Sequence, residues 1–350
     1  MVKGFTFAVP GNLTTPTGGY SYDRRMIAEL EHLGWHIDLV DLGEGFPWPD
    51  NASRMAALAR LSAVPEGRIV VVDGLAFGVL PEAASQLRSR HPLVALVHHP
   101  LALESGLSTE QAEKLRASER TALAAANRVI VTSVATARHL SADYFVPADR
   151  IVVARPGSDP VAAAPGSRDG VVRLLSVGAV VPRKGFDILI AALAMLPDQP
   201  WRLTIVGDRR RDPKTAAQLD ADISRSNLGN RVAVLGAVSP ERLDELYAGA
   251  DLFVLASRFE GYGMAYAEAI AHGLPVIGTT AGAIPDTLPA GTAVFVAPDD
   301  AAALAHALRR LIENSAERRQ LALSARAAAR QLPTWQDSAK IFSRTLEDLA

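Results

Sequence analysis

The chain of 350 residues is longer than the roughly 250 to 300 residues at which a single hydrophobic core stops growing, so two domains are expected. Hydrophobic residues make up 49% and charged residues 21% of the chain, a globular composition that excludes intrinsic disorder and low-complexity classes. The net charge of -2 provides no electrostatic footprint for nucleic acid, and the absence of cysteine excludes disulfides, thiol nucleophiles and cysteine-ligated metals.

The amino-terminal stretch Met1–Phe5 leads directly into a strand-like segment, without the apolar run of roughly 7 to 15 residues that marks a secretory leader. No stretch reaches the ~18 uninterrupted apolar residues of a membrane span. We therefore expect a cytoplasmic protein, and a weak association with a membrane surface is left open.

The first half begins with a strand, a helix and a second strand. The strand is expected over Gly4–Val9, and a loop, Pro10–Gly19, leads into a helix over Tyr22–Leu33. Gly34 follows that helix where a left-handed residue commonly ends one, and the next strand is expected over Trp35–Leu42. Further strands are expected over Arg68–Asp73, Leu93–Val97 and Arg128–Thr132, with a capped helix from Ser108 to Ala126 before the last of them.

A second cycle of strands and helices follows the small-residue stretch Val161–Gly170, where no periodic pattern is present. We therefore expect one domain over residues 1–165 and another over 166–333. Two Rossmann-like, doubly wound parallel sheets facing a cleft are predicted, with ligands bound beyond the carboxyl ends of the strands. Strands of the second domain are expected over Arg173–Val177, Trp201–Val206, Val232–Leu235, Leu252–Ala256, Pro275–Gly278 and Gly291–Val296, and late helices over Ala301–Glu313, Glu317–Gln331 and beyond Trp335.

The strongest local signal is the segment Ser257–Glu268, which lies between an apolar strand and a helix. Gly261 and Gly263 allow the backbone to approach a ligand, and the free N–H groups at the start of the helix suit a phosphate. Glu268 lies about one turn into the helix, where its carboxylate could accept both hydroxyls of a ribose. Glu260 could contact the hydroxyls of a group attached to the phosphate.

Glu260 and Glu268, with seven residues between them and followed by Ala-His-Gly-Leu-Pro-Val-Ile-Gly, resemble the E-x7-E signature of retaining glycosyltransferases of family 4. The resemblance is specific over about residues 170–300 and weaker in the first half. It implies a GT-B architecture whose first domain, completed by a final helix over 334–350, binds the acceptor, while the second binds a nucleotide-sugar donor. Supporting strings are Ser176-Val177-Gly178, Pro182-Arg183-Lys184-Gly185-Phe186-Asp187, Thr204-Ile205-Val206-Gly207 and Gly282-Ala283-Ile284-Pro285-Asp286.

The resemblance also implies roles for individual residues. Glu268 would hold the ribose, Glu260 and His98 the sugar, and Lys184 the diphosphate leaving group. The family usually has an arginine where this chain has Ala179, so either Arg183 supplies the second cation or the leaving group is stabilised in another way. The catalytic residues implied are His98, Lys184 and Glu260, and the donor-binding residues are Gly18, Gly19, Arg183, Lys184, Glu260, Gly261, Tyr262, Gly263, Met264 and Glu268.

Several of these residues also have a structural interpretation. Lys184 could be an exposed lysine at the start of a helix, and His98-His99 could be a pair that ends a strand, with the functional histidine ambiguous between the two. Asp73, at the end of a strand, is a candidate for acceptor contact by position alone.

Two charged runs are interpreted as surface. Arg209-Arg210-Arg211 is flanked by aspartates and predicts a hydrated loop. Asp220-Ala221-Asp222 spells the D-x-D motif of metal-dependent glycosyltransferases, but it falls in a helical segment, where carboxylates two residues apart do not share one face. No metal site is therefore predicted.

The resulting hypothesis is a retaining glycosyltransferase that uses a UDP-, GDP- or ADP-sugar, with no metal, no cofactor and no covalent protein intermediate. Its acceptor is a small molecule, lipid or glycan, and no motif in the first half of the chain identifies which. Two alternatives are a nucleotide-sugar 2-epimerase of the same fold and a non-catalytic sugar-nucleotide binding protein, the latter suggested by Ala179. A nicotinamide dehydrogenase is disfavoured because Pro10-Gly11-Asn12, and not G-x-G-x-x-G, follows the first strand.

Overall fold

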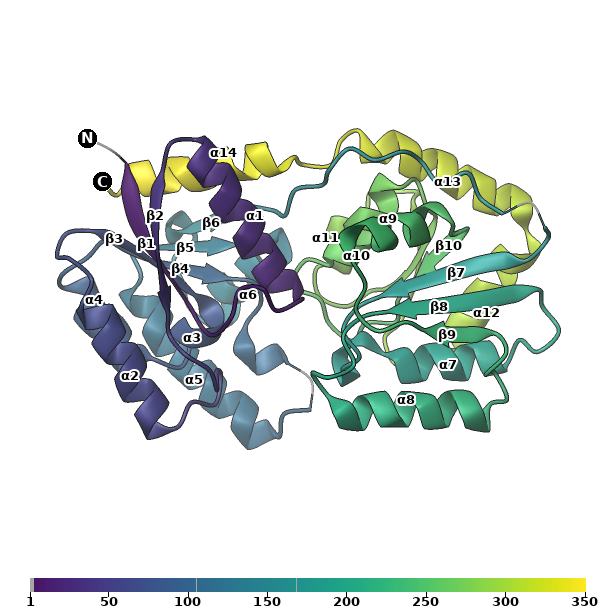
Figure 1. Ribbon diagram of the computed structural model, residues 1–350, viewed down its shortest axis with the longest axis horizontal. Coiled ribbons are helices and arrows are strands. Elements are labelled where there is room, and N and C mark those ends of the chain that lie inside the picture. Colours follow the sequence, from purple (N-terminus) through teal and green to yellow (C-terminus); the bar gives the residue numbers. More distant parts are fainter. Residues whose placement is uncertain (1–2, 105, 168) are drawn as a thin grey trace. The chain divides into compact units, whose positions relative to one another are not determined.

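The computed structural model describes residues 3–104, 106–167 and 169–350, and the chain divides into two units. Unit 1 consists of Met1–Gly157 and Pro333–Ala350, and unit 2 of Ser158–Leu332. Each unit contains one six-stranded sheet flanked by helices (Figure 1). The strands pair in parallel in both sheets, as the alternation of apolar runs and helical stretches predicts.

The sheet of unit 1 has the order β2-β1-β3-β4-β5-β6. Because the order reverses between β1 and β3, this is the point of the sheet where doubly wound folds bind ligands. The strands are β1 Gly4–Val9, β2 His36–Asp41, β3 Ile69–Asp73, β4 Leu93–Val97, β5 Arg128–Val131 and β6 Ile151–Val153. The helices are α1 Gly18–His32, α2 Asn51–Ser62, α3 Gly74–Phe77, α4 Pro81–Arg88, α5 Thr109–Ala125, α6 Val134–Asp143 and α14 Trp335–Glu347.

The sheet of unit 2 has the order β12-β11-β10-β7-β8-β9, so its order reverses between β7 and β10. Helix α7 packs against both α8 and α12, and α10 packs against α13 (Figure 1). The strands are β7 Val172–Val177, β8 Trp201–Val206, β9 Val232–Val234, β10 Leu252–Val254, β11 Val276–Thr279 and β12 Ala293–Val296. The helices are α7 Phe186–Ala194, α8 Pro213–Arg225, α9 Pro240–Ala248, α10 Met264–Ala271, α11 Ile284–Thr287, α12 Ala301–Glu313 and α13 Ser315–Ala329.

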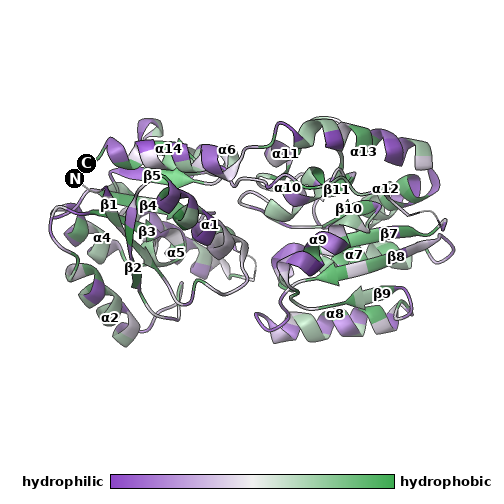
Figure 2. Cartoon of the chain, turned by 45° about the horizontal axis from the view of Figure 1, so that its top comes forward, coloured by the Kyte–Doolittle hydropathy of each residue, from purple (hydrophilic) through white to green (hydrophobic). Residues whose placement is uncertain are grey.

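The core of each unit is formed mainly by its strands and by the inner faces of its helices. Strands β3, β4 and β10 are buried along their whole length, which is why they are continuous apolar runs in the sequence. Helix α8 alternates between hydrophilic and hydrophobic residues, whereas β7 and β8 are mostly hydrophobic (Figure 2). Among the described residues, no helix combines the length and the apolar character that crossing a bilayer requires.

The first helix starts earlier than the sequence predicts. The loop expected over residues 10–19 ends at Thr17, whose side chain accepts the backbone N–H of Tyr20 and caps α1. Gly18 and Gly19 are therefore the first two residues of a helix, and the prediction that they lie in a loop is wrong. Glycine disfavours helices, so Gly18 and Gly19 obscure the start of α1 in the sequence. The N-cap at Thr17 is what marks the end of the loop.

The division between the units also differs from the predicted boundary at residue 165, because it follows Gly157. Residues after this point belong to unit 2, where the N–H of Ala164 donates to the carbonyl of His272 over 2.8 Å and Ala164 is buried in the core. Helix α14 belongs to unit 1, where the indole Nε1 of Trp35 donates to Ser343 over 2.9 Å.

Candidate functional site

Two loops of unit 2 meet at the point where the strand order reverses. One follows β7 and contains Arg183 and Lys184, and the other follows β10 and contains Ser257 to Gly263. The N–H of Arg258 donates to the carbonyl of Arg183 over 2.8 Å, and the Arg183 guanidinium donates to the carbonyl of Phe259 over 2.9 Å. These bonds hold the two loops together.

Glu260 is the centre of this site, and its side chain is 7% exposed. Its Oε1 accepts the ammonium of Lys184 over 2.6 Å and the hydroxyl of Ser257 over 2.6 Å. Its Oε2 accepts the guanidinium of Arg183 over 3.2 Å. The structure thus brings together Glu260, Arg183 and Lys184, which the sequence singles out, and adds Ser257.

Burial alone would raise the pKa of Glu260, because a charge is poorly solvated inside a protein. The charges of Lys184 and Arg183 and the hydrogen bonds to the carboxylate outweigh burial, and the pKa falls to about 2. Glu260 is therefore ionised throughout the neutral range. Two cations facing one carboxylate leave the cluster with a net charge of +1, which suits an anionic ligand.

Glycines shape the Lys184 side of the site. A Cβ on Gly178 would lie 3.1 Å from Cδ and Cε of Lys184, so the lysine stem lies closely over the position before Ala179. Gly185 has a positive φ of +65°, and a Cβ there would lie 2.0 Å from the carbonyl oxygen of Ala256. The loop after β7 can therefore pass this close to β10 only with glycine at residue 185.

The glycine loop before α10 is held by the segment around residue 282. Gly263 precedes the first residue of α10, Met264, and has a φ of +93°. The carbonyl of Glu260 accepts the N–H of Ala283 over 2.9 Å, and the carbonyl of buried Tyr262 accepts the hydroxyl of Thr287 over 2.5 Å. These contacts fix the backbone from Glu260 through Gly261 to Met264.

Glu268 is half-buried on α10, and its Oε2 accepts the hydroxyl of Tyr247 over 2.9 Å. Burial raises the pKa of Glu268, while the bond from Tyr247 and the charge of Lys184 act in the opposite direction. The Tyr247 ring stacks on His272, with centroids 4.8 Å apart. Tyr247 was missed in the sequence. Its only signal is that a residue with a polar hydroxyl lies on the buried side of a short amphipathic helix.

Unit 1 contains a second cluster, centred on His98 after β4. The Nε2 of His98 lies 3.1 Å from Oδ1 of Asp23 on α1 and 3.3 Å from Oδ2 of Asp73 at the end of β3. Asp23 is fully buried, Asp73 nearly so, and His98 is 19% exposed. A Cβ on Gly19 would lie 3.1 Å from Cδ2 of the same ring, and Gly18 precedes it as the first residue of α1.

Electrostatics couple these three groups. Burial alone would lower the pKa of His98, but the charges and hydrogen bonds of Asp23 and Asp73 raise it to about 10. Burial raises the pKa of Asp23 to about 6, although the imidazolium of His98 acts against it. The adjacent His99 instead pairs with Glu104, at 3.4 Å.

The sequence contains a signal for Asp23 that was missed. Asp23, Met26 and Leu30 are buried at a spacing of three and four residues, so the aspartate lies on the apolar face of α1. A carboxylate on such a face requires a buried partner.

The D-x-D string of the sequence lies apart from both clusters. Asp220 is exposed on α8 and pairs with Arg209, and Asp222 is half-buried on the same helix and pairs with Arg225. Within the described ranges, the group of side chains whose spacing could suit a cation is Asp23, Asp73 and His98, with ligand atoms within 4.8 Å of one another. The distances from the two carboxylates to Nε2 of His98 are also those of ordinary hydrogen bonds.

Two family matches cover most of the chain. Residues 161–328 match the family described as "Glycosyl transferases group 1", and residues 24–161 match "Glycosyltransferase Family 4". The two matches meet at residue 161 and correspond closely to the two units.

Curated relatives carry related names. D-inositol 3-phosphate glycosyltransferase of Nocardia farcinica is 29% identical over 265 residues, which are 69% of this chain and 58% of that protein. MMP alpha-(1->4)-mannosyltransferase of Mycolicibacterium hassiacum is 29% identical over 327 residues, 87% of this chain and 77% of that protein. The chain thus spans less than two thirds of the first relative's length.

Solved structures share the fold. Sucrose-phosphate synthase from Thermosynechococcus elongatus superposes with a TM-score of 0.80 at 23% identity, covering 99% of both chains. Anabaena HepE in complex with UDP and glucose superposes with a TM-score of 0.78 at 21% identity, covering 99% of this chain and 100% of that one. These similarities confirm the GT-B architecture.

Proposed function

The chain belongs to the group 1 glycosyltransferases, and from this premise we propose that it transfers a sugar from a nucleoside diphosphate sugar to an acceptor hydroxyl, with retention of anomeric configuration. The observation that carries the proposal is the cluster of Lys184, Arg183 and Glu260 beside the glycine loop of unit 2. A surplus positive charge next to the N–H groups at the start of α10 suits a diphosphate. The similar HepE structure is a complex with UDP and glucose, which is consistent with such a donor.

Individual groups have distinct tasks in this proposal. The backbone from Gly261 to Met264 binds the sugar and the distal phosphate, and Glu268 accepts the ribose hydroxyls with the oxygen that Tyr247 does not use. Lys184 and Arg183 contact the diphosphate, with Arg183 compensating for Ala179. Glu260 and His98 each orient sugar hydroxyls, and Gly18 and Gly19 form the helix start beside His98.

The chemical step needs no protein nucleophile. The bond between the anomeric carbon and the diphosphate oxygen breaks, and a bond to the acceptor oxygen forms on the same face of the sugar. The acceptor's proton passes to the departing diphosphate oxygen, whose negative charge Lys184 stabilises. Positioning and charge stabilisation supply the rate enhancement, so we propose that neither metal nor cofactor takes part.

Donor turnover by two variants tests the proposal. Lys184→Ala and Glu268→Ala should each lower nucleoside diphosphate release from the preferred UDP-, GDP- or ADP-sugar by about 100-fold or more, because each removes a charged contact to the donor. Lys214→Ala, on the exposed side of α8, is the matched control and should retain full turnover. Near-normal turnover in both site variants would remove the assignment.

Product analysis separates the proposal from its alternatives. A labelled donor incubated with acceptors from a cell extract should yield a glycosylated product together with free nucleoside diphosphate. Interconversion of the sugar without an acceptor would instead identify a 2-epimerase. Donor-induced thermal stabilisation without any release would identify a non-catalytic binding protein. The acceptor class and a cytoplasmic location stay predictions.

A further inference from the structure

Asp23 lowers the stability of the fold. Its carboxylate is wholly buried on α1, and its Oδ2 has no hydrogen-bond partner within the described part of the chain. A buried carboxylate oxygen without a partner destabilises a protein by roughly 1 to 3 kcal/mol or more. Asp23 therefore has a role other than packing.

The other carboxylate of the cluster is fixed in place. Asp73 caps α3, where its Oδ1 accepts the N–H of Leu75 over 2.8 Å, and its Oδ2 faces His98. Both aspartates thus direct an oxygen at the same ring nitrogen, Nε2. A carboxylate can only accept, so this arrangement requires a proton on Nε2.

We propose that Asp23 is a positioning residue which, together with Asp73, holds His98 in one orientation as an imidazolium, so that unit 1 presents a fixed cationic donor to a hydroxyl or phosphate oxygen of the substrate. This inference rests on the proposed function only where it assigns His98 to substrate contact. The two aspartates use Nε2, and the second N–H of an imidazolium, at Nδ1, is the donor that they leave for a ligand.

The surroundings of His98 support a charged ring. Two carboxylates about 3 Å from one nitrogen would repel each other in a buried site unless a positive charge lay between them. The other faces of the cluster carry the Tyr22 ring, whose centroid lies 5.4 Å from that of His98 in a T-shaped arrangement, and the glycine at residue 19. Arg24 is the further cation whose charge acts on Asp23.

The charge state of His98 can be measured without any sugar. The protein has eight histidines, and selective ¹³C/¹⁵N labelling would resolve their imidazole signals by NMR, with His98 assigned as the signal lost in His98→Gln. In the wild-type protein we expect both ring nitrogens of His98 to stay protonated up to about pH 9. Titration of His98 near its ordinary pKa of about 6.5 in the wild-type protein would overturn the proposal.

Activity should then show a specific pH dependence in Asp23→Asn. The variant retains the shape of the side chain but loses the charge, so His98 should lose its proton at a lower pH. Below about pH 6 the wild-type Asp23 is itself protonated, and the two proteins should have similar kcat. Above the lowered pKa, the ratio of wild-type to variant kcat should rise by about tenfold for each pH unit.

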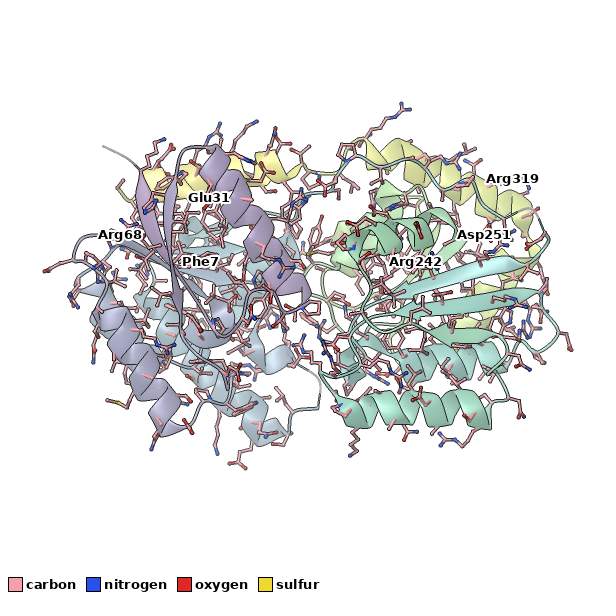
Figure 3. The ribbon with its side chains drawn as sticks, viewed as in Figure 1. Phe7, Glu31, Arg68, Arg242, Asp251 and Arg319 are labelled. Atoms are coloured by element: carbon pink, nitrogen blue, oxygen red, sulfur yellow. The ribbon has the colours of Figure 1, made fainter. Side chains whose placement is uncertain are left out.

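Two variants make this result diagnostic. Glu31 is an exposed carboxylate on the same helix, α1 (Figure 3). The control variant Glu31→Gln should leave kcat and its pH profile unchanged. Asp23→Glu retains the charge and should restore part of the kcat that Asp23→Asn loses at alkaline pH. A kcat deficit in Asp23→Asn that is the same at pH 5 and pH 9 would mean a merely structural role and would overturn the inference.

Failure of this inference is distinguishable from failure of the proposed function. If His98 is an imidazolium but no donor is turned over, the cluster is as proposed and the transferase assignment fails. If donor turnover is normal but His98 is neutral at pH 7, the transferase assignment stands and the role of Asp23 fails.

Discussion

The ammonium of Lys184 lies 2.6 Å from Oε1 of Glu260, a residue 76 positions later in the chain. The pair joins the loops after β7 and β10, the two strands between which the order of the unit 2 sheet reverses. Both side chains are largely buried, so the pair is weakly screened by solvent and strongly dependent on its geometry. It therefore contributes to the stability of unit 2 as well as to the proposed binding of a diphosphate.

Glu260 should make unit 2 sensitive to acid. Its pKa is lowered from 4.5 to about 2, so its charged form stabilises the folded state by about 3 kcal/mol at neutral pH. This stabilisation is present above pH 4.5 and is lost as the pH falls towards 2. Between pH 5 and pH 3.5, about 1 kcal/mol of it should disappear from the free energy of unfolding measured in urea.

Glu260→Gln removes the titrating group and should flatten this part of the pH dependence, although it also lowers stability at pH 7 because Lys184 and Arg183 lose the negative charge that faces them. Glu245→Gln is the control, because Glu245 is an exposed carboxylate on α9 that pairs with Arg242. A Glu260→Gln protein whose stability falls as steeply as wild type between pH 5 and pH 3.5 would contradict the assignment.

Tyr247 should affect donor binding through Glu268. Tyr247→Phe removes the hydroxyl that donates to Oε2 of Glu268 over 2.9 Å and leaves the stacked ring in place. We expect the KM for the donor to rise by about tenfold with little change in kcat, because one hydrogen bond that orients the carboxylate is worth about 1 to 1.5 kcal/mol. Initial rates over a donor titration give both constants.

Tyr266→Phe is the matched control for this experiment. Its hydroxyl is also buried but donates to the backbone carbonyl of Leu255 over 2.7 Å, away from Glu268. It should lower stability by about 1 kcal/mol and leave the donor KM unchanged. Equal effects of the two substitutions on KM would show that Tyr247 acts only through packing.

Much of the fold could be predicted because buried parallel strands are short apolar runs. Strands Leu93–Val97 and Trp201–Val206 have the predicted bounds. The strand β6 and the short helices α3 and α11 were not predicted because three or four residues are too few to show a period. Helices α2 and α6 were not predicted because their apolar periodicity is weak. Helix α4 was also not predicted, although its eight residues are amphipathic and begin with Pro81.

The site was only partly predictable for a different reason. Glu260, Lys184 and His98 were found because they lie in motifs that are continuous in sequence. Their pairing was not predicted: Asp23, which was missed, lies 75 residues from His98, and Lys184 lies 76 residues from Glu260. Such pairs depend on which strands are neighbours in the sheet, and the amino-acid pattern of one segment does not contain that information.

Gly282 should be intolerant of any side chain. It has a φ of +57°, and a Cβ there would lie 2.4 Å from the carbonyl oxygen of Glu260 and 3.0 Å from its backbone nitrogen. Gly282→Ala therefore adds a backbone clash at the site to the cost of a left-handed residue, which is about 1 kcal/mol. We expect a loss of at least about 3 kcal/mol in the free energy of unfolding and a loss of donor binding.

Gly291→Ala separates the two costs. Gly291 has a similar φ of +77°, but the nearest atom to its added Cβ would be the hydroxyl of Ser324 at 3.9 Å. This variant should lose only about 1 kcal/mol and should bind the donor normally, as measured by urea unfolding and thermal shift with UDP-sugar. Equal losses in the two variants would show that the approach of Gly282 to Glu260 is not required.

Helix α14 should be needed for the stability of unit 1. Phe342 on α14 is 1% exposed and packs 6.5 Å from the ring of Phe5 on β1, so Phe342→Ala should cost about 3 to 5 kcal/mol. Ile341, the preceding residue, is 38% exposed, and Ile341→Ala should cost less than about 1 kcal/mol. Hydrogen exchange measured by mass spectrometry should show faster exchange of β1 and α1 peptides in Phe342→Ala alone, with the peptides of β7 and β10 unchanged. Faster exchange confined to unit 2 would contradict the assignment of this helix to the core of unit 1.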